Sequence, residues 1–275
     1  MSRIHTAGRL AARLLVGVGL AATTLSAQTA DTARDVQRGA LFTRRDALVA
    51  GAVVAGAVAV MPVDGWLRNR FEARDPQSSA VLHDAATDFR LLGDPGTVIL
   101  SVGTYAVGRL ARRPVVADVG LHATEALLLS ASATALAKVV AGRYRPFASP
   151  RDADEFRPFS GLAGGRTSFP SGHTSASFAV ASVVAEEGSV HWPHASHIVT
   201  PLAYGAATLV GLSRIYNDRH WASDVILGAA VGTYSGVLVE RFARAHPHNA
   251  LERWLVPSGI APDGHGGAAL VWSIR

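Results

Sequence analysis

The chain has 275 residues, of which 49% are hydrophobic and 7% aromatic, and it carries a formal net charge of +5. This length can bury the core of one large domain or two small ones, and the absence of repeats and long linkers favours one. The absence of cysteine excludes disulfides and thiolate metal sites. We expect no nucleic-acid partner.

The N-terminal stretch has the layout of a secretory signal peptide. Three arginines precede an apolar run from Leu14 to Leu25, and the small residues Ser26 and Ala27 follow it. We therefore predict a signal peptide over residues 1–27, followed by a polar segment over residues 28–45. An uncleaved anchor helix is the alternative interpretation.

Six apolar runs predict an all-α fold, a bundle of about six helices over residues 46–245. His122 and Glu125 lie in the third run, where we expect buried hydrogen bonds to a neighbouring helix. Residues 186–197 carry three histidines and are interpreted as a solvated loop, and the tail over residues 246–275 has weak strand character near its end. The six runs are Arg44–Asp64, Thr97–Leu110, Val119–Val140, Thr174–Ala185, Ile198–Leu212 and Val225–Val239.

Three polar motifs lie where these helices begin or end. They are Lys138 with Arg145, then Ser171 with Gly172 and His173, then Arg214 with His220 and Asp224. The first closes the third helix, the second opens the fourth, and the last lies between the fifth and the sixth. Because consecutive helices of an up-and-down bundle are antiparallel, all three motifs should meet at one end of it.

The spacing of His220 and Asp224 is informative. If this segment is helical, the two side chains form an i, i+4 pair, and the carboxylate can accept a hydrogen bond from one imidazole nitrogen. The other nitrogen is then free to act as a base, a metal ligand or a nucleophile. An ordinary histidine–aspartate pair on a helix surface would have the same spacing.

The other motif residues suit an anion. Lys138, Arg145 and Arg214 are fixed positive charges, and guanidinium groups match the paired oxygens of a phosphate-like group. Ser171 and Gly172 lie at a helix start, where backbone N–H groups and the helix dipole favour the same anion. We predict a phosphate site at this end of the bundle.

The two imidazoles complete this chemistry. One of His173 and His220 could attack phosphorus while the other handles the proton of the leaving group. The sequence offers no thiolate or carboxylate cluster for a metal here, so we predict no metal and no cofactor. Phosphate or vanadate could occupy the anion site.

In these motifs the chain resembles the superfamily of type-2 phosphatidic acid phosphatases and vanadium-dependent haloperoxidases. The resemblance covers roughly residues 119–239 and rests on three spaced motifs: Lys138 through Arg145-Pro146, Pro170-Ser171-Gly172-His173, and Ser213-Arg214 with His220 and Asp224. A chance match of three spaced motifs is improbable.

The resemblance implies a role for each residue. His220 would be the nucleophile that forms a phosphohistidine, and Asp224 would orient it. His173 would be the general acid for the departing alkoxide and then the base for water. The phosphoryl oxygens would be held by the remaining motif residues, Lys138, Arg145, Ser171, Gly172 and Arg214. The expected activity is metal-independent hydrolysis of phosphate monoesters.

Two other functions remain open. A vanadium-dependent haloperoxidase would place vanadate where phosphate sits, although the chain is short for that group and the carboxylate four residues after His220 fits the phosphatases better. A non-catalytic membrane or binding protein could keep the same fold, although intact His173, His220 and Asp224 argue against it.

Location and substrate are less constrained. Four of the six apolar runs have 12 to 15 residues, short of the roughly 20 that span a bilayer. The sequence thus favours an exported protein, periplasmic or membrane-associated, with its site on the extracytoplasmic side. The expected partner is a phosphorylated small molecule or lipid: a lipid phosphate, an isoprenoid pyrophosphate or a soluble monoester.

Overall fold

The computed structural model describes residues 41–149, 153–160, 165–247, 259–262 and 268–271. The predicted signal peptide lies outside the described residues. In chain order the elements are α3 (Arg44–Phe71), α4 (Arg74–Gln77), α5 (Ala80–Leu91), η1 (Leu92–Gly96), α6 (Thr97–Leu110), α7 (Pro114–Ala141), α8 (Gly172–His191), α9 (Pro193–Tyr216), α10 (Ala222–Ala245), β1 (Gly259–Pro262) and β2 (Ala268–Val271).

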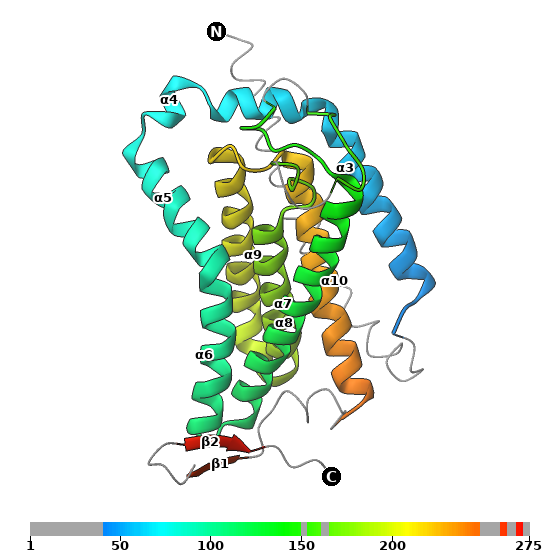
Figure 1. Cartoon of the computed structure of the whole chain (residues 1–275). Coiled ribbons are helices and arrows are strands. Elements are labelled where there is room, and N and C mark those ends of the chain that lie inside the picture. The colour runs from blue at the N-terminus through cyan, green and yellow to red at the C-terminus, as the bar shows by residue number, and fades with distance from the viewer. Residues whose placement is uncertain (1–40, 150–152, 161–164, 248–258, 263–267, 272–275) are drawn as a thin grey trace.

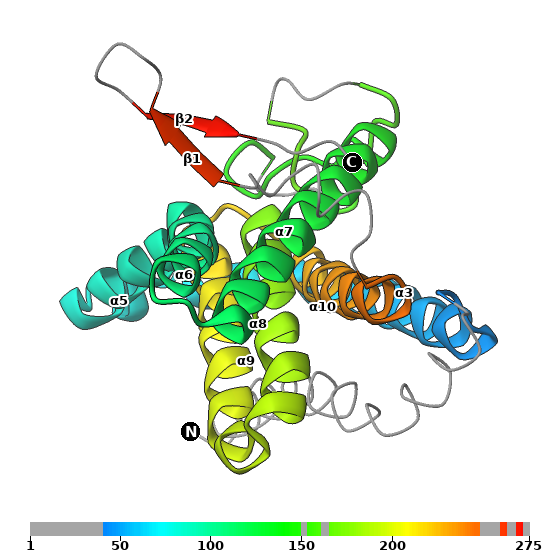
Figure 2. The same ribbon diagram turned by 90° about the horizontal axis from the view of Figure 1, so that it is seen from below.

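The prediction of an all-α bundle is confirmed, and the six long helices correspond to the six apolar runs. Helix α8 packs against α7, α9 and α10, while α6 packs on α7, α3 on α10 and α5 on α9 (Figures 1 and 2). Strands β1 and β2 form an antiparallel pair below the helices in Figure 1. The weak strand signal in the tail thus belongs to a small hairpin outside the bundle.

Small residues allow the central helices to approach closely. Gly228, Gly232 and Gly236 form one stripe on α10, and a Cβ atom at Gly232 would lie 2.1 Å from the Ser175 carbonyl oxygen of α8. Any side chain there would force the two helices apart. The start of α10 is therefore held against the start of α8, where two of the three polar motifs lie.

Local sequence signals set the helix boundaries. Thr43 and Asp46 form a reciprocal capping box at the start of α3. Helix α7 begins with Pro114 in its first turn and ends at Gly142, which has a left-handed φ of 58°. At Gly142 a Cβ would lie 1.9 Å from the Arg157 carbonyl oxygen, so both the backbone angle and the space require glycine.

The interpretation of residues 186–197 as a solvated loop is wrong. Helix α8 continues to His191 and α9 starts at Pro193, so the connection is a single residue, Trp192. Proline is tolerated in the first turn of a helix, where its missing N–H would have no intrahelical partner. Glu186 and Glu187 are buried, because they pair with side chains of other helices.

The helices are also longer than the apolar runs suggested. Four of those in the described residues, α3, α7, α9 and α10, have 24 to 28 residues and are apolar enough to cross a membrane. In α3 only Ala57 and Asp64 are buried, while apolar side chains such as Val54 and Val58 are half exposed. The inference that the helices are too short to span a bilayer is therefore wrong, because it counted only uninterrupted apolar residues.

Candidate active site

The bundle brings the three polar motifs together as their order in the chain predicts. Lys138 is in the last turn of α7, His173 is in the first turn of α8, and Arg214 is in the last turn of α9. His220 lies two residues before α10. These helix ends all lie in the upper half of the bundle in Figure 1. Helix ends therefore position most of the site, and the loop between α7 and α8 adds Arg145.

The cationic side of the site has few acceptors for its donors. Lys138 Nζ donates to the Pro170 carbonyl oxygen at 2.6 Å, and the Arg145 guanidinium donates to Thr167 Oγ1 at 3.1 Å. Burial, then the nearby Arg219, lowers the pKa of Arg145. Arg214 is buried, and its Nε and Nη1 have no hydrogen-bond partner in the described residues. Unpaired buried guanidinium donors are costly, and an anion would satisfy them.

Ser171 and Gly172 differ in what they can offer an anion. Ser171 N–H donates to the Asp224 carbonyl oxygen at 3.0 Å, so it is not free to bind phosphate as we expected. Gly172 opens α8, where the first amides have no intrahelical acceptor. A Cβ at Gly172 would lie 3.5 Å from Lys138 Nζ, which places this backbone beside the lysine charge.

His220 is 2% exposed, and its Nδ1 lies 2.7 Å from the Ser168 carbonyl oxygen. Because a carbonyl only accepts, Nδ1 carries the proton and Nε2 has a free lone pair. Burial lowers the pKa of His220 to about 4 despite the opposing effect of Asp224. The imidazole is thus neutral at pH 7 and has the tautomer that a nucleophile needs.

Asp224 does not hold His220 in the way the spacing suggested. Its Oδ2 lies 3.6 Å from His220 Nδ1, which is an ion-pair distance rather than a hydrogen bond. The carboxylate instead accepts from Ser168 Oγ at 2.5 Å and from the Trp221 N–H at 2.9 Å. Ser168 therefore links the two residues, because its hydroxyl binds Asp224 and its carbonyl binds the imidazole of His220.

Arg143 is a residue of the site that sequence reasoning missed. This side chain is fully buried and donates to Asp224 Oδ1 at 2.6 Å and to Asp64 Oδ2 at 2.8 Å. It lies over the rings of Phe156, Phe169 and Trp221 at 5.1 to 5.9 Å. A second arginine two residues before Arg145, together with an aspartate at the end of an apolar run, was the only available signal.

His173 lies in the first turn of α8, beside the kink between α5 and α6. Burial, followed by the charge of Arg214, lowers the pKa of His173 to about 4. A Cβ on Gly93, in the kink between α5 and α6, would lie 3.4 Å from the His173 ring. The imidazole is therefore neutral in the free protein, and a bound phosphate dianion would favour its protonation.

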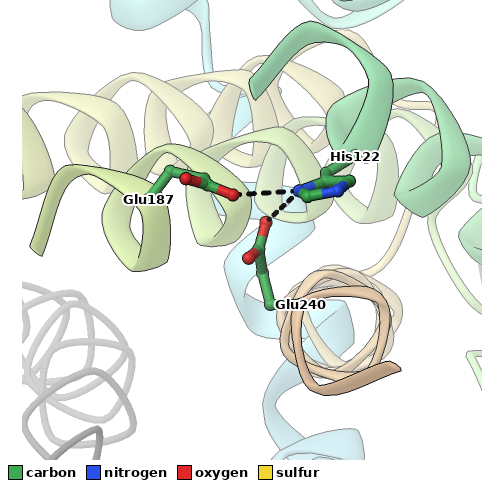
Figure 3. Close-up of side chains that lie close together, drawn as sticks. All are labelled: His122, Glu187 and Glu240. Atoms are coloured by element: carbon green, nitrogen blue, oxygen red, sulfur yellow. Dashed lines mark hydrogen bonds and ion pairs between the residues drawn. The ribbon is translucent and has the colours of Figure 1, made fainter. Parts of the chain in front are cut away.

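A second polar cluster lies far from this site. His122 Nδ1 is 2.9 Å from Glu187 Oε1 and 3.1 Å from Glu240 Oε1, so α7, α8 and α10 each contribute one side chain (Figure 3). This confirms the expected buried hydrogen bond of His122. The three donor atoms could hold a metal ion by their spacing. Sixteen residues of α7 separate His122 from Lys138, or about 24 Å along the helix.

The cluster should contribute to stability rather than to activity. Replacing His122 by leucine keeps most of the volume but leaves two buried carboxylates facing each other, so we expect a loss of about 3–5 kcal/mol in the free energy of unfolding. Thermal unfolding in detergent measures it. Ser132→Ala, which removes an exposed intrahelical hydrogen bond of α7, is the control. An unchanged melting temperature of His122→Leu would contradict a stabilising role.

Comparison with known proteins places this site in a family. The profile of the PAP2 superfamily matches residues 120–247. The lipid A 1-phosphatase of Porphyromonas gingivalis is 46% identical over 71 residues, which are 26% of this chain and 15% of that protein. A PA-phosphatase related-family protein of Dictyostelium discoideum is 29% identical over 150 residues, 52% of this chain and 54% of that protein.

The fold has a solved counterpart as well. The crystal structure of a transmembrane PAP2-type phosphatidylglycerolphosphate phosphatase from Bacillus subtilis has a TM-score of 0.50 and 25% sequence identity to this chain. The match covers 74% of this chain and 96% of the chain in that crystal structure. Together with the four helices of the described residues that are long and apolar enough to cross a bilayer, this likeness supports membrane association.

The chain spans about half or less of the two curated relatives it matches. The matched segment nevertheless contains all eight predicted site residues, from Lys138 to Asp224. The family resemblance of the three motifs is thereby confirmed, because residues 120–247, which contain them, match the PAP2 superfamily.

Proposed function

We propose that the protein is a metal-independent phosphatase that removes the terminal phosphoryl group of a lipid phosphate through a phosphohistidine on His220. The observation that carries the phosphatase chemistry is the buried Arg214, whose unpaired donors lie in a site that also contains Lys138, Arg145 and two neutral imidazoles. An anion with several oxygens would satisfy these donors.

The proposed reaction has two steps, and both histidines act in each. The free Nε2 of His220 attacks phosphorus as the bond from phosphorus to the leaving oxygen breaks, and protonated His173 gives its proton to that oxygen. In the second step His173 takes a proton from water, water attacks phosphorus, and the bond to His220 breaks. Lys138, Arg145 and Arg214 stabilise the charge on the phosphoryl oxygens in both transition states.

A cavity next to the site supports a lipid substrate. It has a volume of about 450 Å³, begins at Lys138, Gly172 and His173, and continues along α6, α7 and α8. Its lining on α7 extends from Thr124 to Lys138, about 21 Å along the helix axis. The side chains along it are mostly apolar or small, so an acyl or prenyl chain would fit.

The cavity is also open on the side of the bundle. Val98 and Val102 of α6 and Leu128 of α7 line it and are 47 to 55% exposed. In a membrane these apolar side chains would contact lipid tails rather than water. A lipid could therefore enter sideways from the bilayer and present its phosphate to the cationic end.

A phosphate-release screen tests the proposed activity. Purified protein is assayed in detergent, with EDTA present throughout, against a lipid phosphate, an isoprenoid pyrophosphate and a soluble aryl monoester. We expect release from the lipid phosphate at the highest kcat/KM. Vanadate-dependent bromination without phosphate release would show a haloperoxidase instead, and loss of activity in EDTA would refute metal independence.

Filling the cavity should weaken the binding of a lipid substrate but leave the reaction of a soluble substrate almost unchanged. Ala131→Trp places a large ring in the middle of the cavity lining, so we expect its KM for the lipid phosphate to rise about tenfold or more, by analogy with the cost of overpacking. The kcat/KM for the aryl monoester should stay within about twofold. Ala133→Trp, on the same helix but outside the lining, is the matched control. Equal losses on both substrates would argue against a lipid cavity.

A further inference from the structure

A buried charge network links the site to α3, a helix outside the matched family segment. Asp64 of α3 is 1% exposed and accepts from Arg143 Nη2 at 2.8 Å. Arg143 in turn donates to Asp224 Oδ1 at 2.6 Å, so the guanidinium bridges two carboxylates that lie 160 residues apart in the chain. Neither Asp64 nor Arg143 is among the eight residues to which the resemblance gives a role.

Ser223 closes this network into a ring. Its N–H donates to Asp64 Oδ1 at 3.0 Å and its Oγ donates to Asp64 Oδ2 at 2.5 Å, while Arg143 Nη1 donates to the same Oγ at 2.7 Å. Ser223 lies in the first turn of α10. Asp64 therefore binds the first turn of α10 and also offsets the positive charge of Arg143.

The charges of the network add up to the net charge that lies beside the His220 imidazole. Asp224 alone would present one negative charge to the imidazole, but Arg143 cancels it at hydrogen-bond distance. Asp64 cancels Arg143 in turn, which restores one net negative charge. The other charged groups that act on His220, Lys138 and Arg145, are positive and would be close to the bound phosphate.

We propose that Asp64 and Arg143 are positioning residues that fix Asp224 and keep the Asp224–His220 pair negatively charged overall, so that positive charge can develop on His220 when it bonds to phosphorus. The proposal rests on the proposed phosphatase function. Arg143 holds the carboxylate in place, and Asp64 prevents the arginine from neutralising it. Thus α3 contributes to the active site without touching the substrate.

The test is the charge balance of three variants. Asp64→Asn keeps the shape of the side chain but removes its charge, so Arg143 and Asp224 then carry no net charge together. The positively charged form of His220 is therefore less stabilised. We expect the pKa of His220 to fall by about half to one unit and kcat to fall by about tenfold to a hundredfold, the range typical of groups that orient a reactive residue. Asp64→Asn/Arg143→Gln restores one net negative charge, and the pKa should return toward the wild-type value even if kcat stays low.

The pKa is measured directly by NMR titration of ¹⁵N-histidine-labelled protein, with the His220 signal assigned by its loss in His220→Gln. Arg68→Gln is the matched control. Arg68 is one helical turn after Asp64 and forms an ion pair of 2.6 Å with Asp218, so it also ties α3 to the segment before α10, but it has no contact with Asp224. This variant should leave both the pKa and kcat close to wild type.

The outcomes separate the two proposals. An unchanged His220 pKa in Asp64→Asn, or the same losses in Arg68→Gln, would show that α3 acts only by packing and would overturn the inference. A double variant with a pKa no closer to wild type than that of Asp64→Asn would do the same. If the pKa shifts are found but the wild-type protein releases no phosphate from any substrate class, the proposed function fails while the charge network stands.

Discussion

The His220→Gln variant is expected to release phosphate at least about 10⁴-fold more slowly than the wild-type protein, because the proposed mechanism takes the attacking lone pair from His220 and uses His173 for proton transfer. Glutamine can still donate a hydrogen bond to the Ser168 carbonyl oxygen, so the fold of the site should persist. Initial rates with the lipid phosphate, normalised to folded protein by thermal unfolding, measure the effect.

The control for this variant is another histidine. His197 is exposed on α9, and His197→Gln should leave the rate unchanged. The wild-type protein should also carry ³²P on His220 after a quench in alkali, a condition chosen because phosphohistidine hydrolyses in acid. Substantial activity of His220→Gln, or label on a different residue, would rule out His220 as the nucleophile.

The second large effect is expected for His173→Asn. Loss of the general acid and base should lower kcat for the lipid phosphate by about 10²- to 10⁴-fold. A phenolate leaves without a proton, so with an aryl monoester the first step should proceed while the second, which needs a base, becomes slow. Phosphorylated protein should then accumulate, and a burst of phenol release measures it. A variant that loses both substrates equally and shows no burst would contradict the assigned role.

The pH profile gives an independent check of His173. Its pKa is about 4 in the free protein because of burial and Arg214, and a bound dianion raises it. As a general acid it must be protonated, so the kcat of the wild-type protein should fall as pH rises through the pKa in the complex. The kcat profile of His173→Asn should lack this basic limb.

The sequence was sufficient to predict the meeting of the motifs but not the contacts within the site. Helix order and antiparallel packing place Lys138, His173 and His220 at one end, whatever the side chains do. The i, i+4 spacing of His220 and Asp224 predicted a direct hydrogen bond, whereas the structure puts the Ser168 carbonyl there. A backbone acceptor has no residue type, so sequence reasoning could not identify it.

Long-range partners were the other gap. Arg143 and Asp64 are 79 residues apart, and in the sequence one lies in a polar stretch and the other at the end of an apolar run. The same local reasoning predicted that Glu186 and Glu187 are solvated, although they pair with residues of other helices. A charged residue next to an apolar run is interpreted as a helix end, because the sequence does not reveal the distant partner that buries it.

Lys138 is the only lysine in the 275 residues, and its ammonium group lies inside the candidate site, bound to the Pro170 carbonyl oxygen. Amine-directed chemistry on this protein is therefore active-site chemistry, apart from the chain's own amino terminus. Phosphate or vanadate in the site would protect Lys138 from an amine reagent, so the unlabelled fraction of Lys138 would measure the fraction of occupied sites. A protein with a surface covered in lysines offers no such measure, so the arginine-rich composition makes the site addressable by a simple reagent.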